Sequence, residues 1–179
     1  IIYTCVADMI TLIHRLGMDE YISSDMEHYL DAEDRNKVIY HAKGDECTDR
    51  LDHVISDAAK LREMLSDDSW LDFPEYQLLI RVLDEQTVSD EDGSVAAKDK
   101  SEISSGSLQN PSDPDATYRS KAGKSHKGYA GNIVETVGED GNSVISSFQY
   151  EQNTYSDSKF MSDYLEDQPE HTEGDGETV

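Results

Sequence analysis

The residues in this sequence best suited to chemistry form a basic cluster in an otherwise acidic chain. Four of the fifteen Lys and Arg residues and one histidine fall within nine positions: Arg119, Lys121, Lys124, His126 and Lys127. The whole chain has a formal net charge of -24, so this local reversal of sign predicts a partner that carries negative charge. Lys and Arg in loops bind the phosphates of nucleic acids. Gly123 and Gly128 have no side chain, so the backbone there can lie close to a ligand. We predict that these five residues contact DNA.

Other interpretations of this cluster remain open. The basic side chains could instead offset neighbouring carboxylates, for which exposed ion pairs contribute only about 0 to 1 kcal/mol each. The neighbouring carboxylates are Asp113, Asp115, Glu135 and Glu139. Tyr118 and Tyr129 bracket the cluster and could stack on a nucleic-acid base. A tyrosine at the start of a strand is, however, more often half-buried core.

The acidic residues favour structural roles. Asp113 and Asp115 flank Pro114 in a loop, where Asp commonly caps turns; contact with a partner or with a metal ion is the alternative. Ser156 or Asp157 can cap the helix that follows, and for Asp157 this role is favoured over metal binding. The two cysteines and six histidines are scattered, without CxxC spacing. We therefore predict neither a disulfide scaffold nor a zinc site, and the cysteine usage fits a reducing cytoplasm.

The first 87 residues have helical periodicity. Apolar residues recur every three or four positions from Ile2 to Leu16, where Gly17 supplies a stop, and again from Leu51 to Leu65. Pro74 suits the first turn of a third helix. The buried stripe of that helix is Leu78, Leu79, Val82 and Leu83, with Trp70 and Phe73 seating it. Shorter helices are expected over 25–29 and 32–41, so a helical bundle is predicted.

The remaining chain changes character twice. Residues 88–107 are rich in Ser, Asp, Glu and Lys and are predicted to form a disordered linker, because they cannot bury enough apolar surface. Residues 108–179 begin with a loop, followed by a β-hairpin over 128–150 and a helix over 157–166. Thr178 and Val179 look like the start of a further strand. The fold class is α+β, with a mostly helical N-terminal part.

Composition limits the class of protein. The chain has 179 residues, of which 36% are hydrophobic, and its mean hydropathy is -0.70. No apolar run approaches the roughly 20 residues that span a bilayer, and no signal-peptide pattern opens the sequence. We expect a soluble, cytoplasmic protein without a membrane segment.

Three stretches together carry a resemblance to a known family. They read PEYQLLIRVLDEQT, DPDATYRSKAGKSHKGYAGNIVETV and FQYEQNTYSDSKFMSDYL, and the second contains a K-x-G-K-x-H-x-G-Y run. In this combination the chain resembles the DDE transposases of bacterial insertion sequences, in the group with a helical insertion in its RNase H-like catalytic domain. The resemblance implies that 1–87 are the helical insertion and that 108–179 are part of the RNase H-like domain.

The same resemblance implies DNA transposition. In this family three carboxylates hold two Mg²⁺ ions that promote phosphodiester cleavage and strand transfer on transposon-end DNA, and subunits assemble on that DNA, which makes a homo-oligomer possible. By this resemblance we expect the first catalytic Asp before Ile1 and the second Asp and the Glu beyond Val179. We assign no catalytic residue and no metal ligand to this sequence, and we expect the isolated chain to bind no Mg²⁺ and to be inactive alone.

The residues are compatible with two further functions. A stand-alone acidic protein-interaction module is the main alternative, since the net charge disfavours free association with DNA. A hydrolase that uses its own carboxylates finds less support, because no pair of carboxylates lies in a motif with a base, a nucleophile or a phosphate-binding loop. The Gly-Lys-Ser at 123–125 lacks the upstream glycine of a P-loop.

Overall fold

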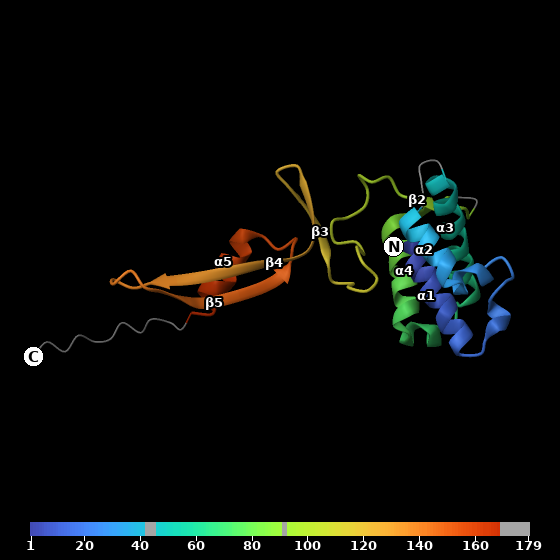
Figure 1. Ribbon diagram of the computed structural model, residues 1–179, viewed down its shortest axis with the longest axis horizontal. Coiled ribbons are helices and arrows are strands. Elements are labelled where there is room, and N and C mark those ends of the chain that lie inside the picture. The colour runs from blue at the N-terminus through green and yellow to red at the C-terminus, as the bar shows by residue number, and fades with distance from the viewer. Residues whose placement is uncertain (42–45, 91–92, 169–179) are drawn as a thin grey trace, which may run out of the picture. The chain divides into compact units, whose positions relative to one another are not determined.

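The chain folds into two compact units, Ile1–Ala116 and Thr117–Val179. The computed structural model describes residues 1–41, 46–90 and 93–168. The first unit is mainly helical, and the second consists of an antiparallel sheet and one helix (Figure 1). The fold class is therefore α+β.

The first unit contains α-helices, short 3-10 helices and a two-stranded sheet. In chain order these elements are α1 (Ile2–Arg15), η1 (Asp19–Tyr21), η2 (Glu27–Leu30), α2 (Ala32–His41), α3 (Glu46–Met64), η3 (Asp68–Asp72), α4 (Pro74–Gln86), β1 (Thr87–Ser89) and β2 (Val95–Ala97). The helices lie where the apolar periodicity predicts them, except that the helix expected over 25–29 is the 3-10 turn η2. None of the helices in the described ranges is long and apolar enough to cross a membrane.

Local signals in the sequence explain where two helices begin and end. Gly17 has φ +69, a left-handed conformation that glycine adopts without steric cost, and the chain leaves α1 there. Pro74 occupies the first turn of α4, where its missing N–H leaves no hydrogen bond unmade.

The core of the first unit is built around α1. Its fully buried residues come from several helices, from the segments that follow them and from one position far along the chain: Val6, Ala7, Met9, Ile10, Ile13, Met26, Ala58, Leu61, Leu65, Leu79, Val82 and Leu108. Trp70 is buried at the edge of this cluster, with its ring 5.7 Å from that of Phe73. Both aromatic side chains therefore seat α4 as the sequence predicts.

Parts of the stretch 88–107, which the sequence predicts to be a disordered linker, are folded onto the first unit. Strand β1 pairs antiparallel with β2, and Ser107 is buried, so the boundary between the units falls at Ala116 rather than at either end of this stretch. Lys98 Nζ donates to the carbonyl oxygens of Asp84 and Glu85 at 2.8 and 3.0 Å, which satisfies the C-terminal end of α4.

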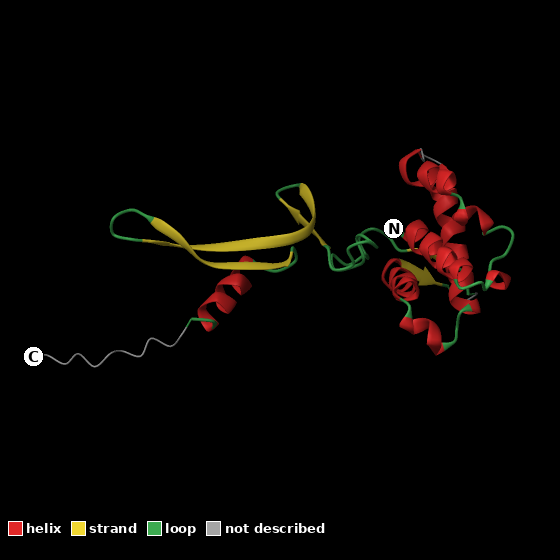
Figure 2. Ribbon diagram, turned by 60° about the horizontal axis from the view of Figure 1, so that its bottom comes forward, coloured by secondary structure: helices red, strands yellow, loops and turns green. Residues whose placement is uncertain are grey.

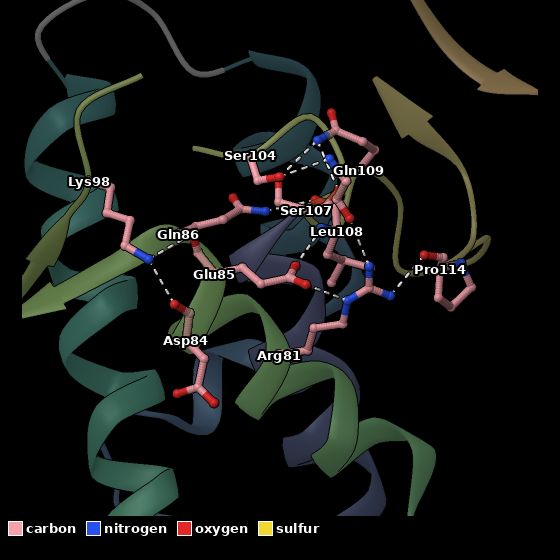
Figure 3. Close-up of polar contacts among 11 residues, drawn as sticks. Arg81, Asp84, Glu85, Gln86, Lys98, Ser104, Ser107, Leu108, Gln109 and Pro114 are labelled. Atoms are coloured by element: carbon pink, nitrogen blue, oxygen red, sulfur yellow. Dashed lines mark hydrogen bonds and ion pairs between the residues drawn. The ribbon is translucent and has the colours of Figure 1, made fainter. Parts of the chain in front are cut away.

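Polar side chains of α4 hold the rest of this segment (Figure 3). Arg81 donates to the carbonyl oxygens of Gly106 and Pro114 at 3.2 and 2.9 Å and forms an ion pair with Glu85 at 2.9 Å. Glu85 accepts the backbone N–H of Leu108 at 2.6 Å, and Gln86 donates to the carbonyl oxygen of Leu108 at 2.7 Å. The segment has few apolar residues, which is why the sequence predicts disorder for it. Hydrogen bonds from α4 side chains to its backbone hold it instead.

The second unit consists of β3 (Thr117–Lys121), β4 (Lys124–Val137), β5 (Ser143–Gln152) and α5 (Asp157–Glu166). The strands form one antiparallel sheet in the order β3-β4-β5, and Figure 2 shows β4 and β5 as a long ribbon with α5 beside it. Helix α5 spans the predicted range, and β4 and β5 form the expected hairpin. The further strand expected near Val179 lies outside the described residues.

Strand β3 corrects the sequence prediction. The sequence predicts a loop over 110–127 before a strand at Gly128, but β3 and the first residues of β4 pair across a tight turn. The basic cluster therefore lies on a β-hairpin.

Candidate nucleic-acid interface

The basic hairpin, defined as residues 117–128 of β3 and β4, turns at two residues. Ala122 has φ +52 and Gly123 has φ +74, and Lys121 pairs with Lys124 on either side of them. Two successive residues with positive φ are typical of the type I′ turn, whose twist matches that of the flanking strands. Glycine is the usual second residue of such turns, as Gly123 is here. Ala122, the first turn residue, is strained because its Cβ disfavours a positive φ.

The register of the hairpin gathers four of the five predicted residues on one face. Arg119 pairs with His126, and Lys121 pairs with Lys124. Directly paired residues project to the same side, and so do residues two apart on a strand. Lys127 pairs with Tyr118 and lies on the opposite face.

The basic face concentrates positive charge without internal compensation. Lys121 and Lys124 stand directly opposite each other, an arrangement that destabilises a sheet when no anion lies between the two charges. Residues 117–128 contain no Asp or Glu. The side chains of Lys124 and Lys127 are exposed, and no ion pair within the described residues involves either of them.

One carboxylate does lie near the basic face. Asp157 Oδ1 is 3.9 Å from Arg119, and its Oδ2 is 3.8 Å from Lys121. Asp157 is 79% exposed and both distances are long, so these pairs contribute at most about 1 kcal/mol. Of the two caps that the sequence offers for α5, Ser156 and Asp157, Ser156 is the N-cap: its hydroxyl oxygen accepts the N–H of Lys159 at 3.2 Å.

Asn153 supports the hairpin and was not singled out by the sequence. Its side chain is buried, donates to the carbonyl oxygen of His126 at 3.0 Å and accepts the hydroxyl of the buried Thr117 at 2.8 Å. Arg119 Nη1 also donates to the Asn153 carbonyl oxygen at 3.4 Å. An Asn directly after a strand is common in loops, so only the three-dimensional pairing identifies its role.

The two tyrosines that bracket the cluster have different surroundings. Tyr118 is half-buried, and its hydroxyl is 3.0 Å from that of Ser125 across the hairpin. Tyr129 stacks on Tyr150 of β5, with ring centroids 4.9 Å apart. Tyr118 is therefore held within the hairpin, whereas Tyr129 belongs to a row of rings on the β4–β5 ribbon.

The described residues offer no metal centre. Within 1–41, 46–90 and 93–168, no three His, Cys, Asp or Glu side chains gather in a group that could hold a metal ion. We derive no chemical step through Mg²⁺.

Comparisons with known proteins add no relative. No family model, curated protein or solved structure matches this chain. What can be said of its function comes from its own residues.

Proposed function

We propose that this chain is part of a DDE transposase and that its basic hairpin binds the phosphates of transposon-end DNA. The observation that carries the proposal is the register that places Arg119, Lys121, Lys124 and His126 on one face. Cations spaced along two paired strands suit a run of phosphates, and an anion would relieve the repulsion between Lys121 and Lys124.

The transposase assignment rests on the motifs of the sequence, and the fold lends it support in outline. A helical region precedes an antiparallel hairpin and a helix, which is the order expected for a helical insertion followed by part of an RNase H-like domain. Strand β3 is an addition to that expectation. Reading the DNA on both sides of the coding segment tests the assignment: a reading frame without an Asp-bearing strand upstream and without an Asp and a Glu downstream would contradict it.

Catalysis is not part of the proposal for these residues. The role proposed for the basic hairpin is DNA contact, while cleavage and strand transfer would need the three carboxylates of the family.

The binding proposal is tested on the full chain with labelled duplex DNA at low salt. Arg119→Glu/Lys124→Glu reverses two charges of the basic face, and we expect it to abolish retardation of the DNA in a gel. Lys37→Glu/Lys100→Glu is the matched control, because it changes the net charge equally at exposed positions of the first unit. Equal binding by both double variants would contradict the proposal.

A stand-alone acidic interaction module is a second candidate, favoured by one groove of the first unit. The groove has a volume of about 740 Å³. Its lining holds five carboxylates and two cations, and one of the cations, Lys60, forms ion pairs with Asp25 and Asp57. The carboxylates are Asp25, Asp34, Asp49, Asp52 and Asp57. A basic peptide would be the partner, and titration with an Arg-rich peptide before and after Asp49→Asn/Asp52→Asn would detect it. Equal affinity of both proteins would remove this candidate.

A further inference from the structure

Helix α5 begins beside the basic hairpin, and its first residue is an acid. The carboxylate of Asp157 reaches two cations of β3: its Oδ1 is 3.9 Å from Arg119 Nη2, and its Oδ2 is 3.8 Å from Lys121 Nζ. Arg119 and Lys121 are two residues apart on one strand, so their side chains project to the same side of the sheet. One carboxylate therefore bridges two cations of the basic face and presents a separate oxygen to each.

A DNA phosphate has the features that the Asp157 carboxylate has in this position. Each phosphate of the DNA backbone carries one negative charge and has two oxygens that are free to accept hydrogen bonds. Arginine pairs with carboxylates and with phosphates through the same N–H groups, and lysine binds both as a point charge. The carboxylate of Asp157 therefore occupies the place in which a phosphate would contact Arg119 and Lys121 together.

The contact that Asp157 makes is easily displaced. Its side chain is 79% exposed, and ion pairs at such exposed positions are weak. The start of α5 does not depend on this carboxylate for its cap, because the hydroxyl oxygen of Ser156 accepts the N–H of Lys159. Asp157 can therefore leave Arg119 and Lys121 while the helix keeps its N-cap.

We propose that Asp157 competes with DNA for Arg119 and Lys121, so that a phosphate binds these two cations only by displacing its carboxylate. This inference rests on the proposed DNA binding by the basic hairpin and adds to it a residue that lowers the affinity. The cations of β4 differ, because Lys124 forms no ion pair in the part of the chain that the structure describes. A phosphate at Lys124 therefore meets no competing carboxylate.

The experiment measures the affinity of the full chain for a labelled DNA duplex by fluorescence anisotropy. Asp157→Asn should bind about two- to fivefold more tightly, the gain that the loss of weak competing ion pairs allows. Glu166→Gln is the matched control, because it makes the same change of net charge at the exposed last residue of α5. The two positions are roughly 14 Å apart along the helix, beyond the Debye length of about 10 Å at about 0.1 M salt. Equal gains in both variants would overturn the inference, since they would show general repulsion of DNA.

A double-mutant cycle shows through which cations Asp157 acts. The gain on Asp157→Asn should vanish in an Arg119→Gln/Lys121→Gln background and persist in a Lys124→Gln background. A gain that persists without the two β3 cations would overturn the inference.

The same measurements separate this inference from the proposed function. Binding that needs the cations of the basic hairpin but does not change on Asp157→Asn would overturn the inference and retain the proposed function. Binding that is equal with and without those cations, or no binding of DNA by any variant, would contradict both.

Discussion

Thr117 donates its hydroxyl to the side-chain oxygen of Asn153 at 2.8 Å, and both side chains are buried. Asn153 follows β5, whereas Thr117 begins β3, so this bond ties the two ends of the second unit's sheet together. The Asn153 amide nitrogen also donates to the carbonyl oxygen of His126 on β4. The geometry of the basic face therefore depends on a residue that carries no charge.

Replacing Asn153 should loosen the basic hairpin. Asn153→Ala leaves the Thr117 hydroxyl and the His126 carbonyl without this partner, at a cost of about 1 to 3 kcal/mol. Hydrogen exchange should show faster exchange of the β3 amides and of the first β4 amides. Asn142→Ala, in the exposed turn between β4 and β5, is the control and should leave these amides unchanged. Equal protection in both variants would show that Asn153 does not support the hairpin.

The turn of the hairpin should be open to stabilisation. Ala122 has φ +52, where a residue with a Cβ is strained by about 1 to 2 kcal/mol and where Asn is tolerated. Ala122→Asn should slow exchange of the β3 amides, and Ala122→Val should accelerate it. The opposite order would mean that Ala122 does not adopt the left-handed conformation.

The sequence predicts the helices well and the basic hairpin poorly, for physical reasons. Helices α1, α3 and α4 are amphipathic, so apolar spacing locates them, and Gly17 and Pro74 mark a helix end and a helix start. Strand β3 has no alternation of large apolar residues, and it is held by backbone pairing and by Asn153, which lies 36 residues after Thr117. The one local signal was the Ala122-Gly123 dipeptide between two polar runs, which suits a two-residue turn.

The segment between the units shows the same limit. A low content of apolar residues predicted a linker at 88–107, but α4 supplies Arg81, Glu85 and Gln86 as hydrogen-bond partners for the backbone that follows. The composition of a segment indicates how much apolar surface it can bury. It does not indicate which hydrogen-bond partners a neighbouring helix supplies. Leu108 is the visible consequence, because it enters the core directly after a polar stretch.

A buried hydrogen bond should stabilise the first unit. Tyr29 donates its hydroxyl to Asp57 Oδ2 at 2.9 Å, and Asp57, which is 6% exposed, also accepts from Lys60 at 3.1 Å. Tyr29→Phe should reduce the free energy of unfolding by about 1 to 3 kcal/mol, because the buried carboxylate loses a donor. Urea unfolding followed by the fluorescence of Trp70, the one tryptophan of the sequence, measures the change.

Tyr76→Phe provides the control for that measurement. The Tyr76 ring is also buried, but no hydrogen bond of its hydroxyl is seen within the described residues, so the loss of this oxygen should cost little. A similar loss of stability in the Tyr29 and Tyr76 variants would contradict a specific role for the bond to Asp57.

The first unit should lose stability at alkaline pH, as its buried thiol and phenol groups ionise. Burial raises the pKa of the Cys5 thiol from 9.0 to about 11, and burial together with Asp57 raises the pKa of Tyr29. A folded-state pKa above the unfolded value gives stability that is complete below the unfolded pKa and is lost as pH rises through the folded one. Urea midpoints from Trp70 fluorescence should therefore fall from pH 9 upward. In Cys5→Ala this fall should be smaller between pH 9 and about 11, and an unchanged slope would contradict the buried thiol's part in it.

The most direct test of the central claim is the salt dependence of duplex DNA binding by the full chain. If the basic hairpin binds about four phosphates, the logarithm of the affinity should fall with the logarithm of salt concentration with a slope of about -3 to -4. Arg119→Gln/Lys124→Gln should reduce the magnitude of this slope by about 2, whereas Lys37→Gln/Lys100→Gln should leave it unchanged. A slope that is the same in the hairpin variant and in the unmodified chain would contradict phosphate binding by the hairpin.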